Sequence, residues 1–255
     1  MARESKKESR GVRWRLWLGL LGLGAAFVST GFAAFKVRQY VIADPQFSLS
    51  RDRRDALTIE GVRYSSRSRV QRIFAGDFDH SVFSVPLGER RRRLLAIDWV
   101  EDASVSRIWP DRLVVRIRER KPVAFVTLRS GILLVDAHGV LLESPLQASF
   151  TFPVLSGVKE DESESGRRER VRTLLRLEED MGYLMKDISE VDTSDPDDLR
   201  VVTQVDHRAL TLLLGDNNFG RRYQNFLNHY PDIERQSPEV KIFDLRLDDR
   251  ITAED

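Results

Sequence analysis

Residues 99–122 of the chain, WVEDASVSRIWPDRLVVRIRERKP, predict a β-hairpin around which the rest of the fold is organised. Its second half alternates, so that Leu113, Val115 and Ile117 fall on one face of a strand and the residues between them on the other. The Trp-Pro-Asp sequence at 109–111 favours a tight turn, because proline fixes φ and aspartate bonds to its own backbone. We therefore expect two short strands, the second buried on one side.

A strand and two helices are predicted before the hairpin. Residues 57–60 alternate apolar and polar side chains and are followed by Gly61, which is typical of a short strand that ends in a turn. Ser66 or Ser68 can cap the first helix, and residues 86–96 predict a second helix that begins with a proline. The expected order is strand, helix, helix, strand, strand.

The hairpin also carries a family resemblance. Residues 99–124 follow the pattern W-V-x-x-A-x-V-x-R-x-W-P-x-x-L-x-V-x-I-x-E-R-x-P-x-A. This pattern resembles the end of the POTRA domain of FtsQ/DivIB, a family of bacterial cell-division proteins. Ile59-x-Gly61, Phe83-x-Val85 and Leu87 add to the likeness. The resemblance implies a POTRA domain with the order βααββ, which we place at residues 56–122.

A second domain is predicted at residues 123–255, a mixed α/β domain on a largely antiparallel sheet, so that the fold class is α+β. The segments 152–157 and 243–246 resemble the family's L-P-x-L-x-G and I-D-L-R motifs. The resemblance therefore covers most of the chain after residue 55. The expected strands lie at residues 123–128, 132–135, 140–142, 188–191, 199–203, 210–214 and from 240 onward, and the expected helices at 167–186 and 219–230.

The N-terminal part predicts a membrane anchor. Residues 16–35 carry no charge and would span about 30 Å as an α-helix, the thickness of the hydrocarbon layer of a bilayer. Six basic residues precede this segment, so residues 1–15 are expected to form a cytoplasmic tail. We expect one transmembrane helix at 16–35 and an extended linker at 36–55. A cleaved signal peptide is the alternative, but the apolar run is long and lacks a clean cleavage site.

Composition and charge limit the possible functions. Hydrophobic residues make up 41% and charged residues 32% of the chain, which is ordinary for a globular protein, and the absence of cysteine excludes thiol chemistry and disulfides. The net charge of +1 conceals a segregation, because residues 123–255 carry 16 basic against 26 acidic side chains. A nucleic-acid-binding protein would be expected to concentrate positive charge on its main folded mass. Here that mass is acidic, so nucleic acid is not an expected partner.

No constellation of catalytic residues is evident, so we expect no enzyme, cofactor or metal site. The chain has no G-x-S-x-G, Ser-x-x-Lys or Walker sequence. An acid-base pair such as Asp197 and Asp198 would keep ordinary pKa values in an exposed turn. The histidines are too far apart in sequence to set two ligands on one helix face: His80, His138, His207 and His229.

The arginine run at residues 90–93 has two interpretations. It could be a docking patch for an acidic partner or for lipid headgroups. It could also be the solvated face of a helix, which we favour because runs of like charge usually are.

The resemblance implies a scaffold of the division machinery at the septum, held in the cell inner membrane with its bulk outside the cytoplasm. It implies FtsB and FtsL as partners, and other division proteins through the transmembrane helix and the POTRA domain. The chain's last strand, expected over residues 243–252, should place Phe243, Leu245 and Leu247 toward the core and offer its free edge to FtsB. The expected partner-binding residues are Arg246, Leu247, Asp248, Asp249, Arg250, Ile251 and Thr252.

Two other classes of function remain open. One is a POTRA-containing component of secretion or outer-membrane assembly. The other is an envelope enzyme held by the same anchor, which activity-based profiling against cell-wall substrates would reveal.

Overall fold

The computed structural model describes residues 21, 27–33, 35–37, 39–40, 44–145, 148–195, 197–248 and 250–254. The chain divides into two compact units, the first comprising Met1–Val62, Ser66–Leu94 and Ala103–Ile117, and the second Arg63–Ser65, Leu95–Asp102 and Arg118–Asp255. No helix within the described ranges has the length and apolar character needed to cross a membrane. The expected cytoplasmic tail and much of the expected transmembrane helix at 16–35 lie outside the described residues.

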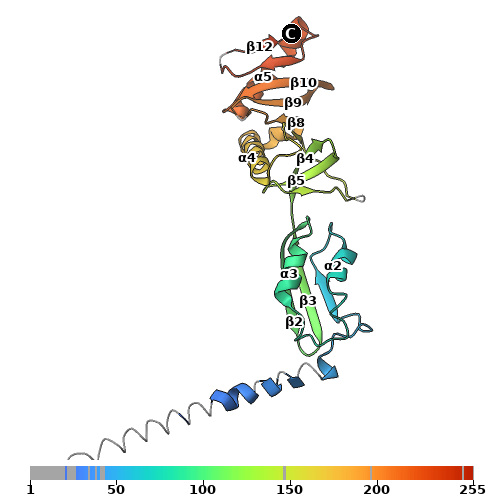
Figure 1. Ribbon diagram of the computed structural model, residues 1–255. Helices are drawn as coiled ribbons and strands as arrows, with labels where there is room; N and C mark the ends of the chain where they lie inside the picture. The colour runs from blue at the N-terminus through green and yellow to red at the C-terminus, as the bar shows by residue number, and fades with distance from the viewer. Residues whose placement is uncertain are drawn as a thin grey trace, which may run out of the picture. The chain divides into compact units, whose positions relative to one another are not determined.

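The first unit is built on a three-stranded sheet with the order β1-β3-β2 (Figure 1). Its elements follow the predicted order: β1 (Leu57–Glu60), α2 (Arg67–Ile73), α3 (Leu87–Leu95), β2 (Val100–Ile108) and β3 (Arg112–Glu119), with β1 parallel to β3. The predicted phase of β3 is confirmed, because Leu113, Val115 and Ile117 are buried. Buried side chains of the two helices and the loop between them complete this core: Val70, Phe74, Val82, Val85 and Leu94.

Gly61 ends β1 because no other residue fits there. Its φ is +81°, a conformation that L side chains rarely adopt, and a Cβ atom would collide with the carbonyl oxygen of Ile117. The side-chain oxygen of Ser66, one of the two predicted caps, then accepts a hydrogen bond of 3.3 Å from the backbone N–H of Arg69 and caps α2.

The segment expected to be an extended linker, residues 36–55, is partly folded against the first unit. Its described residues 36–37 and 39–40 are helical, and a short 3₁₀ helix, η1 (Pro45–Phe47), follows. Phe47 and Leu49 are 3% and 0% exposed, so two apolar side chains of this segment belong to the core. Asp44 caps η1 by accepting a hydrogen bond of 2.9 Å from the N–H of Gln46.

The arginine run is mostly engaged within the first unit. Arg90 forms a bidentate pair with Asp77, with two N–O distances of 2.7 Å, and the Asp77 side chain is only 6% exposed. Arg91 donates to the carbonyl oxygen of Ala103 at 2.7 Å, and Arg93 pairs with Glu89. The interpretation of residues 90–93 as a uniformly solvated face is therefore wrong for Arg90, which supports the loop before α3.

The second unit contains, within its described residues, a nine-stranded sheet with the order β12-β11-β10-β9-β8-β7-β4-β5-β6 (Figure 1). Five of its eight strand pairs are antiparallel and three are parallel, so the predicted largely antiparallel sheet is confirmed. The strands are β4 (Pro122–Leu128), β5 (Gly131–Asp136), β6 (Leu141–Leu142), β7 (Val154–Ser156), β8 (Ile188–Asp192), β9 (Leu199–Val205), β10 (Arg208–Gly215), β11 (Ile242–Asp244) and β12 (Thr252–Glu254).

Two long helices, α4 (Glu164–Met181) and α5 (Phe219–Gln236), pack with the sheet around the main core. Helix α4 begins three residues before the predicted start, because the side chain of Ser163 caps it. After Met181 the chain tightens into a 3₁₀ helix, η2 (Gly182–Asp187). Helix α5 extends six residues beyond the predicted end and contains Pro231.

Residues Glu119 and Arg120, the E-R of the hairpin pattern, bind other parts of the second unit. The Glu119 carboxylate accepts hydrogen bonds from the backbone N–H groups of residues 63–65 and from the Ser65 hydroxyl. Burial alone would raise the pKa of Glu119, but these hydrogen bonds lower it below its usual value. Arg120 donates to the buried carboxylate of Asp136 at 2.8 Å.

Candidate partner-binding edge

The C-terminal segment forms two short strands instead of the single strand expected over residues 243–252. Strand β11 ends at Asp244, the chain turns near Asp248, and β12 returns antiparallel to β11. The register pairs Ile242 with Glu254, Phe243 with Ala253 and Asp244 with Thr252. The outermost strand is therefore β12, and β11 is covered on both sides.

The backbone pattern shows which groups of β12 face outward. The N–H of Thr211 donates to Lys241 and the N–H of Leu245 to Leu213, so in this parallel ladder Phe243 points its N–H and C=O toward β10. The flanking residues of β11 then point toward β12. It follows that Ala253, opposite Phe243, directs its N–H and C=O away from the sheet, toward the open edge.

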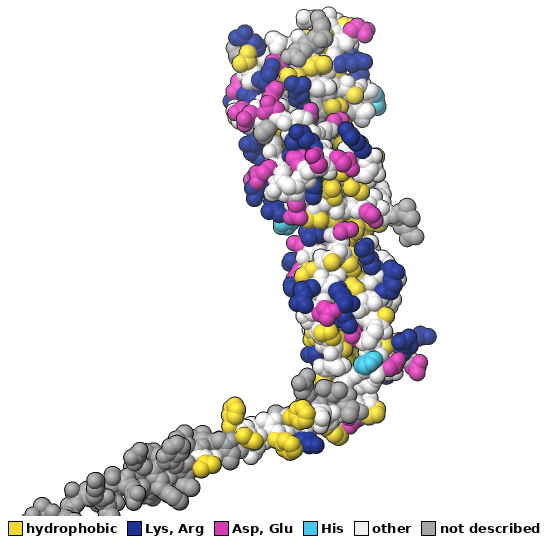
Figure 2. All heavy atoms as spheres, viewed as in Figure 1, with side chains coloured by type: hydrophobic (Ala, Val, Ile, Leu, Met, Phe, Trp, Pro, Cys, Tyr) yellow, Lys and Arg dark blue, Asp and Glu magenta, His cyan; other side chains and the backbone are white. Residues whose placement is uncertain are grey.

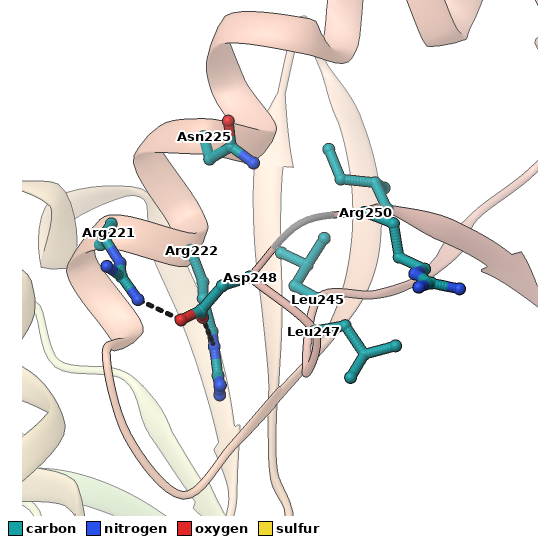
Figure 3. A pocket seen from close by; sticks show the side chains of 8 residues that line it. Arg221, Arg222, Asn225, Leu245, Leu247, Asp248 and Arg250 are labelled. Atoms are coloured by element: carbon teal, nitrogen blue, oxygen red, sulfur yellow. Dashed lines mark hydrogen bonds and ion pairs between the residues drawn. The ribbon is translucent and has the colours of Figure 1, made fainter.

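Ion pairs hold the loop between the two strands in place. Asp248 lies between two arginines of the first turn of α5, and Arg222 donates from Nε at 2.9 Å while Arg221 pairs with the other oxygen (Figure 3). Arg222 is 10% exposed and also donates at 2.6 Å to the carbonyl oxygen of Leu214. Asp248 therefore anchors the turn that brings the chain back to the sheet edge.

Arg246 is bound within its own domain. Its guanidinium donates to Asp244 at 2.9 and 2.6 Å and reaches Asp198 at 3.4 Å. The hydrogen bond from Arg246 is the main reason that the pKa of Asp244 lies below its usual value. Arg246, expected to bind a partner, thus forms ion pairs within its own domain.

The remaining predicted residues occupy different positions. Phe243 and Leu245 are buried as expected, but Leu247 is 55% exposed, so its predicted inward direction is wrong. The reason is that the strand ends at Asp244 and the alternation stops there. Arg250 and Ile251 lie in the return to β12, Thr252 begins that strand, and Asp249 lies outside the described residues.

A pocket of about 210 Å³ opens beside this loop (Figure 3). The exposed Leu247 is part of its lining, so the pocket combines apolar and charged side chains near this sheet edge. Ala253 at the open edge, and Arg221 and Arg222 that hold Asp248, were not among the residues predicted from the sequence. The turn itself had a local signal, because an adjacent Asp248-Asp249 pair is typical of a turn. The residues that line the pocket are Arg221, Arg222, Asn225, Leu245, Leu247, Asp248, Arg250 and Ile251.

Charged side chains of both signs are interspersed over the visible face of the second unit (Figure 2). The described residues contain no group of three or more His, Asp or Glu side chains that could hold a metal ion. Asp198, considered above as part of an acid-base pair, is instead the partner of Arg246 and Arg200.

Two family models match the chain. The model described as "POTRA domain, FtsQ-type" matches residues 55–120, and the model described as "Cell division protein FtsQ/DivIB, C-terminal" matches residues 124–246. The second match ends at Arg246, just before the turn that leads to β12.

Curated relatives and a solved structure are also similar. Cell division protein FtsQ of Koribacter versatilis is 37% identical over 203 residues, which are 77% of this chain and 58% of that protein. FtsQ of Shewanella oneidensis is 26% identical over 93% of this chain and 85% of its own length. The extracytoplasmic domain of DivIB from Geobacillus stearothermophilus matches 47% of this chain and 95% of its own, at 20% identity and a TM-score of 0.28, too low to support an argument.

Proposed function

Because the chain belongs to the FtsQ/DivIB family of bacterial cell-division proteins, we propose that it is a scaffold of the division machinery that works by binding other proteins. The proposed partners are FtsB and FtsL, and through them the scaffold would help to control septal peptidoglycan synthesis. Other division proteins would contact the transmembrane helix and the POTRA domain.

The observation that supports this proposal most is the open edge at β12. An edge strand with free N–H and C=O groups can accept a strand from another protein, and main-chain bonds then supply the affinity. Ala253 offers both groups, and its neighbour Thr252 is exposed. The clamp on Asp248 holds the preceding turn, so the edge is ordered before a partner arrives, which lowers the entropic cost of binding.

Arg246 and Asp248 then act indirectly, because their contacts lie within the domain. They hold the loop that carries the exposed Leu247, and Leu247 is placed to contact an apolar side chain of the added strand. We retain residues 246–252 as the binding region and extend it to Ala253 and Glu254 of β12.

We further propose that residues 16–35 anchor the chain in the inner membrane at the division septum. The support is the uncharged length of this segment and the basic residues before it. The two folded units would then lie outside the cytoplasm, where the partner strand must be presented.

The topology predicts a labelling pattern. The chain has no cysteine, so single cysteines can be introduced at Ser5 and Ser163 without background. In intact spheroplasts, a membrane-impermeant maleimide should label the chain with Ser163→Cys and leave the chain with Ser5→Cys unlabelled until the membrane is opened. Labelling at Ser5 and protection at Ser163 would reverse the orientation.

Copurification tests the proposed function. The full chain should retain FtsB and FtsL when isolated from dividing cells, and a chain that stops at Arg246 should lose them, because it lacks β12. A fluorescent fusion should show whether the shortened chain still reaches the septum. Undiminished retention of both partners by the shortened chain would place the binding edge elsewhere.

A further inference from the structure

The tip of the β2–β3 hairpin exposes two large apolar side chains. Trp109 is 65% exposed and Ile108 is 39% exposed, although most apolar residues of the first unit are buried. One side of the Trp109 ring packs on Phe47, with 5.1 Å between ring centroids, and on Phe83, at 6.4 Å. The hairpin tip therefore lies beside the place where the chain first enters the folded unit.

That place is close in sequence to the proposed anchor. Phe47 lies 12 positions after Phe35, the last residue of the uncharged segment 16–35. Such a segment reaches at most about 40 Å when fully extended and about 18 Å when helical. The described residues 35–37 and 39–40 are helical, so part of this segment is shorter than an extended chain. The connection thus limits how far Trp109 can lie from a membrane that holds the anchor.

A basic pocket adjoins the same tip. Its volume is about 460 Å³, and its lining includes Arg51, Arg53, Arg54 and Arg72. Arg53 pairs with Asp111 in the hairpin turn, two residues from Trp109, so the pocket and the exposed indole belong to one end of the unit. Four arginines therefore line the pocket at this end of the unit.

Two of these arginines have guanidinium groups that are available to bind an anion. Within the described residues, the guanidinium groups of Arg54 and Arg72 make no hydrogen bond or ion pair. Arg51 pairs with Asp79 at 3.5 Å, but both side chains are more than half exposed. This differs from the run at residues 90–93, where Arg90 is held by the buried Asp77. Basic side chains are visible on the first unit in Figure 2.

We propose that this end of the first unit docks on the surface of an anionic phospholipid membrane. Arg54 and Arg72, with Arg51, bind headgroup phosphates, because guanidinium groups match phosphate oxygens in charge and geometry. Trp109 lies at the headgroup level, where amphipathic rings are favoured. The inference rests on the proposed anchor, which supplies the membrane. Docking fixes the first unit beside the bilayer.

The test uses the full chain in vesicles of phosphatidylcholine with or without phosphatidylglycerol, both containing a headgroup-region quenching lipid. An NBD label is placed on one cysteine at a time, in Lys36→Cys, Ile108→Cys or Tyr183→Cys chains. Position 36 reports the anchor, and Ile108, 39% exposed beside Trp109, reports the hairpin tip while the indole is kept. Tyr183, 74% exposed in the second unit, reports an undocked surface. We expect quenching at 36 in both vesicles, quenching at 108 only with phosphatidylglycerol, and no quenching at 183 in either vesicle.

The arginine variants identify the contact. Arg54→Ala and Arg72→Ala should each reduce the ratio of docked to undocked chain, read at position 108, about fivefold. Arg116→Ala is the matched control, since Arg116 is exposed on the face of β3 that points away from the core, and it should change nothing.

The outcomes separate the docking from the anchor. Quenching at 36 without quenching at 108 would overturn the docking and leave the anchor intact. Equal quenching at 108 in both vesicles, unaffected by the arginine changes, would overturn the role of anionic headgroups. Absence of quenching at 36 would overturn the anchor and the docking together.

Discussion

The Ala253→Pro chain is expected to lose detectable binding to FtsB while its second unit stays folded. Proline removes one N–H group, and at residue 253 that group points to the open edge and not to β11. A strand added at this edge would face a gap in its hydrogen-bond ladder and the proline ring. The measurement is binding of purified FtsB ectodomain to the reconstituted full chain, with circular dichroism and thermal unfolding as the check on folding.

Two matched variants make this result specific. Ala253→Ser keeps the N–H group and should bind as the unchanged chain does. Thr252→Pro removes an N–H that faces β11, so it should loosen β12 itself and lower stability as well as binding. Normal binding by Ala253→Pro would mean that the partner does not pair with this edge.

Ile117→Ala is expected to destabilise the first unit by about 2–5 kcal/mol. Ile117 is 6% exposed and lies on the buried face of β3 with Leu113 and Val115. Truncation leaves a cavity that the surrounding helices and strands can close only in part. The free energy of unfolding in urea measures the effect, and the slope of the transition should stay the same if only stability changes.

Arg116→Ala supplies the comparison one residue away. Arg116 is exposed and pairs with Glu60 at 2.9 Å, an arrangement that contributes on the order of 0–1 kcal/mol. The variant should therefore unfold close to the unchanged chain. Equal losses for the two variants would contradict the division of β3 into a buried and a wet face.

Much of the fold could be predicted from the sequence because its signals are local. The alternation of Leu113, Val115 and Ile117 has period two, and the structure buries all three. Turn residues separate β2 from β3, and Gly61 marks a backbone conformation that only glycine adopts easily. Where pattern and turn chemistry agree over several residues, few alternative folds remain.

Other features depend on contacts distant in sequence. Arg90 is half-buried because it pairs with the buried Asp77, and a run of arginines carries no sign of this pairing. Phe47 and Leu49 are two isolated apolar residues in a polar segment, so they gave no periodic signal for the 3₁₀ helix and the core contacts they form. Tertiary packing overrides composition at these positions.

The form of the candidate site was not predicted from the sequence. The alternation of Phe243, Leu245 and Leu247 suggested one strand, yet Asp248 is drawn to Arg221 and Arg222 and the chain turns. Those two arginines precede Asp248 by more than 25 residues, so the local pattern did not indicate this contact. The register of β12 then decides which backbone groups are available, and only the structure supplies it.

Amide hydrogen exchange of the reconstituted full chain, with and without FtsB, tests most directly whether the protein binds its partner through β12. We expect slower exchange at Ala253, whose N–H faces the open edge, and little change at the opposite end of the sheet in β6. Protection centred on other strands, with residue 253 still exchanging freely in the complex, would contradict edge-strand binding.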